Sequence, residues 1–524
     1  MALIRFSVIL LLCSIEIESS NNLFDLTRRL RLLDPPTDSE VSTKIVSDQY
    51  FKQRIDHFNP TDTRVYNQRY YVNEDYYNED SNHVFLMLGG EWEANTIWLN
   101  SGAWIDSAKK YGAILFYLEH RFYGQSQPFE DLSTENLQYL SAHQALADAA
   151  NFIKGMNDKY NMSTSEAKWI VYGGSYAGTL ASWIRHKYPH LVTGSVDSSG
   201  PLEAVLDFRE YLQVVQEGLG THSESCVTNV TAAFNKLDEL LEGCLEDPEI
   251  YTELKSMFQL CDSIELDESS EKDLSSLFEL MVDNNFAYAV QYNGRSEISI
   301  DNVCTIMTND TADTSPLQKL GEVNSLVLKS SGSDCLSFDY EKFVLSHQNT
   351  TLPSSSMSRQ WLYQTCTEFG FFQTSSQTHP IFSSRFDVTF FTDLCLDVFG
   401  AQFTASFTSA AIHATNVRYG GVKAPITNVV HFHSRIDPWH ALGKLKTTDD
   451  ARDWVIIVDD ASHCASMYSI SDTDSVDLAN AKKEIDRLVG VWLKVIPDDS
   501  TGSASSTAAS FYMFFIFTIV RFIE

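Results

Sequence analysis

The strongest chemical signal in the sequence surrounds Ser175. An apolar run at 169–172 reads as a short strand, a helical pattern begins near residue 179, and the small-residue turn between them is Gly173-Gly174-Ser175-Tyr176-Ala177-Gly178. A serine at the apex of such a strand–turn–helix presents its hydroxyl above a sheet as a nucleophile. Ala177 stands where the strict pattern has a second glycine, but alanine is still small. A plain glycine-rich turn with a capping serine is the alternative.

A serine hydroxyl reacts only when a base takes its proton and an acid orients that base. Asp437 follows an apolar strand pattern at 428–432, and His463 follows another at 455–458. The order serine, acid, histidine is the one that a strand–turn–helix nucleophile requires. The carboxyl ends of parallel strands meet at one edge of a sheet, so we predict that Ser175, Asp437 and His463 form a catalytic triad.

An acyl-transfer site also needs backbone N–H groups that hold the developing oxyanion. One is predicted at Tyr176, directly after the serine. The other is predicted in the turn after the apolar run 83–88, at Gly90 and Glu91. Glycine there allows the backbone to approach a substrate closely.

Two further histidines permit a different interpretation. His431 and His433 are two residues apart, so on a strand they share one face, as metal ligands can. Asp437 or His440 could complete such a site. No further ligand cluster accompanies them, so we predict no metal and no organic cofactor, and polar residues at a strand end are the simpler interpretation.

The elements around these residues alternate between strand and helix, which is typical of a mostly parallel α/β sheet. The expected strands are 83–88, 113–118, 169–172, 192–197, 428–432 and 455–458, and the expected helices are 102–111, 141–156, 179–188 and 477–495. The alternation breaks at 201–414, which we interpret as a helical insertion. The core is therefore discontinuous, at 50–200 and 415–496.

The N-terminus has the form of a signal peptide at 1–20, with Arg5 before an apolar run that is too short to span a bilayer. Eight cysteines follow it, an even number that suits disulfides in an oxidising compartment, although the pairing stays open. Acceptor sites for N-glycosylation are predicted at Asn161, Asn229, Asn309 and Asn349.

The net charge of −32 disfavours nucleic acid as a partner. The chain ends in a polar spacer and a hydrophobic tail at 497–524. This arrangement suggests a GPI-attachment signal, which would tether the protein to a membrane, although Arg521 and Glu524 depart from the pattern.

Several longer strings resemble a known family of serine peptidases. The family includes lysosomal Pro-X carboxypeptidase, dipeptidyl peptidase II and thymus-specific serine protease. The strings that carry the resemblance are Gly89-Gly90-Glu91, Leu118-Glu119-His120-Arg121-Phe122-Tyr123-Gly124-Gln125-Ser126, the turn at Ser175, Asp437-Pro438-Trp439, and residues 359–371, which look closest to the thymus-specific branch.

The resemblance implies an α/β-hydrolase core, mostly a parallel sheet, with a large inserted, mainly helical domain. It implies the same triad and an exopeptidase that often acts after proline. A substrate pocket is then expected at Trp361, Tyr363, Glu368, Phe369 and Trp439, although these aromatic residues could equally form the core of the insertion. Glu91 and Glu368 are candidates for binding a peptide amine.

Two features depart from the family pattern. The family often has Asn-Gly before the acid, where this chain has His433-Ser434-Arg435-Ile436, and Trp92 stands where glycine is usual. A bulky Trp92 could narrow the entrance beside the oxyanion turn.

The resemblance implies peptide substrates and an extracellular or lysosomal location, and it leaves a homodimer open. A carboxylesterase or lipase on the same fold, or a non-catalytic binding protein, is the alternative function.

Overall fold

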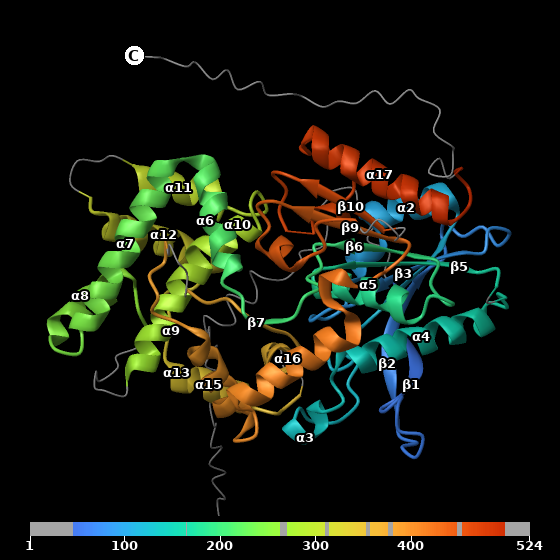
Figure 1. Ribbon diagram of the computed structural model, residues 1–524, viewed down its shortest axis with the longest axis horizontal. Coiled ribbons are helices and arrows are strands. Elements are labelled where there is room, and N and C mark those ends of the chain that lie inside the picture. Colours follow the sequence, from blue (N-terminus) through green and yellow to red (C-terminus); the bar gives the residue numbers. More distant parts are fainter. Residues whose placement is uncertain are drawn as a thin grey trace, which may run out of the picture.

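The structure is a computed structural model that describes residues 46–163, 165–261, 270–309, 314–352, 357–375, 381–447 and 453–497. The signal peptide predicted at 1–20 and the tail after residue 497 lie outside these ranges. A strand-rich part and a helical part lie side by side (Figure 1).

The strand-rich part is built on one eight-stranded sheet in the order β1-β2-β4-β3-β5-β6-β9-β10. Six neighbouring strands from β4 to β10 are parallel, and β1 and β2 add an antiparallel edge. The bounds are β1 Gln49–Arg54, β2 Val65–Asn73, β3 His83–Leu88, β4 Ile114–Leu118, β5 Lys168–Gly174, β6 Gly194–Ser198, β9 Val429–Ser434 and β10 Asp453–Val458.

Helices cover both faces of this sheet, as a mostly parallel sheet requires. Helices α4 (Ala142–Lys159) and α5 (Tyr176–Lys187) pack on one face, and α2 (Ala103–Tyr111) and α17 (Val476–Trp492) pack on the other. Strand β3 contributes to both cores: Val84 and Leu86 face α4 and α5, whereas Phe85 and Met87 face α2 and α17. Successive side chains of a strand point to opposite faces of the sheet, and helices cover both faces, so every residue of β3 is buried.

The predicted α/β-hydrolase fold with a helical insertion is confirmed. The six predicted strands and four predicted helices are all present. Helix α5 begins at Tyr176 rather than at 179, because Ser175 itself occupies the N-cap position. The helix therefore starts directly at the predicted nucleophile.

The helical part lies between β6 and β9 in the chain. Its longer helices are α6 Glu210–His222, α7 Glu224–Gly243, α8 Pro248–Met257, α9 Glu271–Val282, α11 Ile300–Thr308, α12 Pro316–Ser331, α13 Tyr340–Gln348, α15 Val388–Phe399 and α16 Ala405–Tyr419. The shorter ones are η3 Asp283–Ala287, α10 Tyr288–Gln291, α14 Ser358–Gln364 and η4 Thr365–Phe369. The boundary predicted at residue 414 falls inside α16. A two-stranded sheet, β7 (Val205–Asp207) with β8 (Gly370–Phe372), also belongs to this part.

Five short elements remain in the part of the chain that the structure describes. They are η1 Thr96–Leu99, α3 Thr134–Leu137, η5 Gly421–Lys423, η6 Pro438–Leu442 and η7 Ala465–Met467. Among the described residues, no helix is both long enough and apolar enough to cross a bilayer.

Six cysteines form three disulfides, and all three lie in the helical part. The pairs are Cys226–Cys304, Cys261–Cys335 and Cys366–Cys395. Cys244 and Cys464 are buried thiols without a disulfide partner. Three disulfides fit an oxidising compartment. Each one also lowers the conformational entropy of the unfolded chain and thereby stabilises the folded state.

Candidate active site

Ser175 sits in a strained turn between β5 and α5. Its backbone angles are φ 58° and ψ −131°, a combination that non-glycine residues rarely adopt. The turn is held by the Ser175 N–H, which donates to the Ser198 carbonyl at 2.9 Å, and by the Thr179 N–H, which donates to the Ser175 carbonyl at 3.1 Å. Ser175 is only partly covered, whereas its neighbours on both sides are buried. The strain therefore presents this side chain at the surface of the site.

The small residues around Ser175 are required by close backbone contacts. A Cβ atom on Gly173 would lie 2.0 Å from the Ala177 carbonyl oxygen. A Cβ on Gly174 would lie 2.2 Å from Met467 Sδ, and one on Gly178 would lie 2.6 Å from Asp197 Oδ1. Ala177, which replaces the second glycine of the strict pattern, is buried, and its Cβ would lie 3.5 Å from a Cβ on Gly90, an ordinary van der Waals distance. The departure from the strict glycine pattern therefore does not change the turn.

Asp437 and His463 are brought together from two neighbouring strands. Asp437 follows β9 and caps the short helix η6, where it accepts from the Trp439 N–H at 3.1 Å. His463 follows β10, and its Nδ1 lies 2.8 Å from Asp437 Oδ2. His463 Nε2 has no hydrogen-bond partner among the described residues. The imidazole is thus oriented by Asp437 at one nitrogen and free to accept a proton at the other.

The electrostatics of this pair favour its charged form. Burial by itself opposes charge on both groups, but the charge and hydrogen bond of each partner outweigh it. The pKa of the Asp437 carboxyl is consequently lowered and the pKa of His463 is raised well above its ordinary value. Asp437 therefore stabilises the imidazolium that forms when His463 accepts a proton.

The turn predicted to hold the oxyanion lies against the nucleophile turn. A Cβ on Gly90 would lie 3.5 Å from Ala177 Cβ and 3.2 Å from the Trp92 ring. Tyr176, the other predicted donor, is the first residue of α5, so its N–H has no partner within the helix. These contacts bring Gly90 and Tyr176 to the same side of the site.

Glu91 is more than a backbone donor in this turn. Its Oε2 is covered by protein and has no hydrogen-bond partner among the described residues, although the residue as a whole is partly exposed. Burial raises the pKa of Glu91 to about 7, and the charge of His463 opposes that rise. The structure therefore holds a second titratable carboxyl beside the Asp437–His463 pair.

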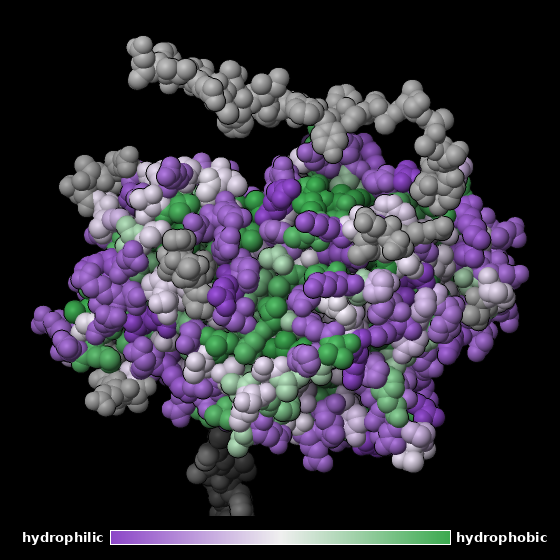
Figure 2. All heavy atoms as spheres, in the orientation of Figure 1, coloured by the Kyte–Doolittle hydropathy of each residue, from purple (hydrophilic) through white to green (hydrophobic). Residues whose placement is uncertain are grey.

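A cavity of about 250 Å³ opens at Ser175 between the sheet and the helical part. Ser175, Tyr176 and Glu91 line it, together with Trp92, which was expected to narrow this entrance. Its other walls include a group of aromatic residues, Trp361, Phe371, Phe372, Phe390, Phe391 and Trp439. Figure 2 shows hydrophobic side chains gathered in a band across the middle of the molecule, between its two parts.

The predicted pocket residues divide into two groups. Trp361 and Trp439 line the cavity, whereas Tyr363, Glu368 and Phe369 are absent from its walls. Glu368 instead accepts from the Ala142 N–H, at 2.9 Å from Oε2, and thereby caps the N-terminus of α4. Tyr363 and Phe369 pack into the hydrophobic core. The sequence could not distinguish residues of the cavity wall from residues of the core, because Trp361 and Tyr363 are only two residues apart on α14 and therefore face opposite ways.

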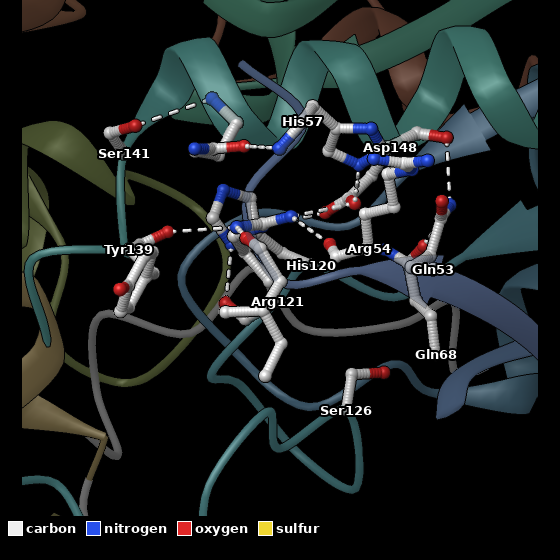
Figure 3. A network of polar contacts seen from close by, with 12 residues as sticks. Gln53, Arg54, His57, Gln68, His120, Arg121, Ser126, Tyr139, Ser141 and Asp148 are labelled. Atoms are coloured by element: carbon white, nitrogen blue, oxygen red, sulfur yellow. Dashed lines mark hydrogen bonds and ion pairs between the residues drawn. The ribbon is translucent and has the colours of Figure 1, made fainter. Parts of the chain in front are cut away.

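Residues 118–126 are absent from the cavity wall, and His120 and Arg121 of this segment belong to a network of polar contacts (Figure 3). The buried Arg121 donates to both carboxylate oxygens of Asp148 on α4, at 2.6 and 2.7 Å. His57 contacts the same carboxylate at 2.7 Å. The neighbouring His120 Nε2 lies 3.1 Å from the Tyr176 hydroxyl. This network therefore ties α4 to the residue that follows the predicted nucleophile.

Two residues that hold His463 were not predicted. The carbonyl of Gln291, on α10 of the helical part, accepts from the His463 N–H at 2.7 Å, and its side chain accepts from Trp439 Nε1 at 3.0 Å. Ser199, with φ 60°, accepts from the Cys464 N–H at 2.8 Å. No sequence motif marks either residue, because both act through contacts between distant segments.

The two histidines of β9 lie in different environments. His431 Nδ1 lies 2.8 Å from Asp197 Oδ2, and His433 is buried, with a pKa that burial lowers to about 4. In the part of the chain that the structure describes, no group of three acidic, histidine or cysteine side chains could hold a metal ion. His431 thus has a structural partner within the sheet.

The predicted glycosylation sites differ in accessibility. Asn161, Asn309 and Asn349 are exposed, whereas Asn229 is half-buried on α7 and donates to the Met307 carbonyl at 2.8 Å. Asn229 is therefore the least suited acceptor of the four.

Comparison with known proteins identifies relatives over most of the chain. The chain is 35% identical to mouse thymus-specific serine protease over 85% of its own length and 87% of the relative. It is 33% identical to the human thymus-specific serine protease, over 85% and 86% of the two chains. It is 27% identical to mouse lysosomal Pro-X carboxypeptidase, over 82% and 85%. Residues 53–485 match the model of the serine carboxypeptidase S28 family. The chain is thus a serine peptidase that belongs to the serine carboxypeptidase S28 family.

Proposed function

We propose that this protein is a serine exopeptidase in which Ser175 is the nucleophile, His463 the base and Asp437 the orienting acid. One observation carries the assignment. The 2.8 Å contact between Asp437 and His463 Nδ1 leaves Nε2 without a partner among the described residues. The His463 ring packs beside Tyr292 and Trp439, which line the same cavity as the strained Ser175. Membership of the serine carboxypeptidase S28 family supports the same reaction.

In the proposed reaction, His463 Nε2 takes the Ser175 proton while Oγ attacks the scissile carbonyl carbon. The oxyanion that forms is held by the N–H groups of Tyr176 and of the Gly90–Glu91 turn. His463 then gives its proton to the leaving nitrogen, the C–N bond breaks, and an acyl-enzyme remains. Water, activated by the same imidazole, attacks the acyl-enzyme and releases the acid product.

The walls of the cavity suggest which side chains the enzyme accepts. Trp361, Phe371 and Trp439 offer flat apolar surfaces beside the nucleophile, and Phe371 and Trp439 meet edge to face at 5.4 Å. Such surfaces suit a proline ring or another compact apolar side chain. The lysosomal Pro-X carboxypeptidase among the relatives supports a role for proline next to the cleaved bond.

The charges of the cavity suggest which end of a peptide is bound. Glu91, Glu279 and Asp283 belong to its described lining, and that lining includes no lysine or arginine. A terminal carboxylate would find no strong cationic donor on these walls, whereas a terminal amine would be attracted. We therefore propose that the amino end of the substrate is the end bound here, although the family is named for carboxypeptidases.

The proposed location is the secretory pathway, either outside the cell or in the lysosome. The three disulfides of the helical part support it. The predicted tail at 497–524 would add a GPI tether, which release of surface activity by a phosphatidylinositol-specific phospholipase would reveal. Activity that stays on cells after this treatment would contradict the tether.

A digest of a peptide library tests the proposed function. Each peptide is supplied in four forms, with free or acetylated amino ends and with free or amidated carboxyl ends, and the products are identified by mass spectrometry. Cleavage by the wild type but not by Ser175→Ala supports a serine peptidase. Loss of cleavage on acetylation supports amine recognition, and loss on amidation instead would show carboxypeptidase action. Hydrolysis of simple acyl esters without any peptide cleavage would contradict the proposal.

A further inference from the structure

A second cavity, of about 180 Å³, lies on the face of the sheet that is covered by α2 and α17. These two helices lie side by side over the sheet (Figure 1). The buried apolar part of its wall consists of Met87, Trp104, Tyr172, Val196 and Ile485, and its exposed edge carries Asp106, Lys110 and Lys483. Neither His463 nor the aromatic walls of the active-site cavity belong to it, so it is a separate site.

One polar group inside this apolar wall lacks a partner. Tyr172 is only 7% exposed, and its hydroxyl makes no hydrogen bond of normal geometry with the described residues, although the Ser107 hydroxyl lies near it. Its ring is fixed by Phe85 at 5.3 Å and Trp104 at 6.1 Å between ring centres. A buried hydroxyl is normally satisfied, so this one is available to a ligand that brings an acceptor oxygen.

The charges at the edge of the cavity leave one cation unpaired. Asp486 already accepts from Ser107 Oγ at 2.7 Å and from Lys110 Nζ. Lys482 is paired with Asp474 at 2.6 Å. Lys483, by contrast, is exposed and forms no ion pair with any residue that the structure describes. An anion at this edge would therefore meet a cation that has no other partner.

The hydroxyl belongs to the buried wall of the cavity and the free cation to its exposed edge. Burial, and then the charge of Asp486, raise the pKa of Tyr172 well above its ordinary value, so the hydroxyl stays protonated and able to donate. Asp486 is three residues after Lys483 on α17, which puts both on one face of the helix.

The cavity also touches the segments that carry Ser175 and His463. Tyr172 and Gly173 precede Ser175 on β5, and both line the cavity. Ser466, from the turn after His463, bonds Ser198 at 2.6 Å between hydroxyl oxygens. Met467, the next residue, fills the space beside Gly174. A ligand in the cavity would thus contact both the segment that carries Ser175 and the segment that carries His463.

We propose that this cavity binds a compact apolar carboxylic acid, of the size of a free apolar amino acid, and that binding slows catalysis. The apolar wall accepts the body of the ligand, and the carboxylate pairs with Lys483 and the Tyr172 hydroxyl. The binding site is independent of the proposed function, whereas its effect on turnover rests on it. Free amino acids are among the products that an exopeptidase releases, so the site could report product accumulation.

Binding is tested by calorimetric titration of the full-length protein with three compounds that share one ring. 3-Phenylpropionate and phenylalanine carry a carboxylate, whereas phenethylamine carries only a cation. We expect both acids to bind and phenethylamine not to bind. Tyr172→Phe should weaken the binding of the acids about fivefold and Lys483→Ala about threefold. Lys154→Ala, an exposed lysine on α4 at the other face of the sheet, should leave binding unchanged.

The proposal is overturned if neither acid binds, if phenethylamine binds equally well, or if Tyr172→Phe and Lys483→Ala both leave the affinity unchanged. Ala103→Trp, placed at the partly exposed mouth, should abolish binding by filling it. In peptide hydrolysis, 3-phenylpropionate should lower kcat without changing KM, and Ala103→Trp should remove this inhibition. Binding without any peptidase activity would contradict the proposed function but leave the site intact.

Discussion

Asp437 Oδ2 and His463 Nδ1 lie 2.8 Å apart, although 25 residues of chain and one strand of the sheet separate the two side chains. The contact is completely buried. It fixes the plane of the imidazole and leaves Nε2 as the nitrogen that has no hydrogen-bond partner among the described residues. The sheet creates this contact, because β9 and β10 are parallel neighbours whose carboxyl ends meet.

Replacing Asp437 by asparagine removes the negative charge from this contact with little change in shape. We expect kcat to fall by about 10³- to 10⁴-fold, because the imidazolium loses its stabilising partner and the tautomer is no longer fixed. Peptide hydrolysis measures the effect, and circular dichroism verifies the fold. A fall of less than tenfold would show that Asp437 is not the acid of the triad.

The same pair predicts the pH dependence of catalysis. His463 must be neutral to act as a base, and Asp437 raises its pKa against the opposing effect of burial. The value of kcat/KM should therefore increase as pH rises, through an acid limb that lies above the ordinary histidine value of 6.5. Asp437→Asn should shift the limb to lower pH in whatever activity remains. A wild-type limb well below the ordinary histidine value would contradict the assignment.

Gly173 should tolerate no side chain. In Gly173→Ala the new Cβ would lie 2.0 Å from the Ala177 carbonyl oxygen, so the turn that carries Ser175 would have to move. We expect a loss of about 3 kcal/mol or more in the free energy of unfolding and the loss of fluorophosphonate labelling. Gly220→Ala on α6 is the matched control, because its Cβ would meet nothing closer than 3.8 Å. Equal behaviour of the two variants would refute the steric argument.

The buried Arg121–Asp148 pair should be costly to break. Arg121→Met leaves the Asp148 carboxylate buried with His57 and Tyr66 as its partners among the described residues, at 2.7 and 2.9 Å. We expect a loss of about 3 to 5 kcal/mol in the free energy of unfolding, measured by chemical denaturation. The double variant Arg121→Met with Asp148→Leu should recover part of this loss, since no unpaired charge then remains. No recovery would show that packing, and not charge, sets the cost.

Glu368 predicts a dependence of stability on pH. Burial raises its pKa to about 7, above the ordinary value of 4.5, so the folded state holds the proton more tightly than the unfolded state. Its contribution to stability is full below the ordinary value and is lost as pH rises through about 7. Glu368→Gln cannot lose a proton, so it avoids this loss of stability. The difference in melting temperature between Glu368→Gln and wild type should therefore grow in favour of the variant between pH 4.5 and about 7, by an amount that corresponds to a few kcal/mol in the free energy of unfolding. Glu341→Gln, exposed on α13, should show no such change. A flat difference for Glu368→Gln would contradict the prediction.

The sequence by itself predicted the strand–turn–helix at Ser175 and the elements around it. The turn at Ser175 was recognisable because a strained apex needs small neighbours, and those residues are adjacent in the chain. The strands and helices around it were predictable because burial on both faces of a parallel sheet leaves continuous apolar runs. The order of Ser175, Asp437 and His463 followed from the same pattern.

Only the tertiary structure decided which distant side chains share a surface. Trp361 lines the cavity while Tyr363 and Glu368 turn away from it, and the contact of Glu368 with α4 joins segments more than two hundred residues apart. The support of His463 by Gln291 and the cavity beneath Tyr172 likewise depend on how separate elements pack. Such contacts leave no local periodicity in the sequence, because burial constrains a residue to be apolar or paired without specifying its partner.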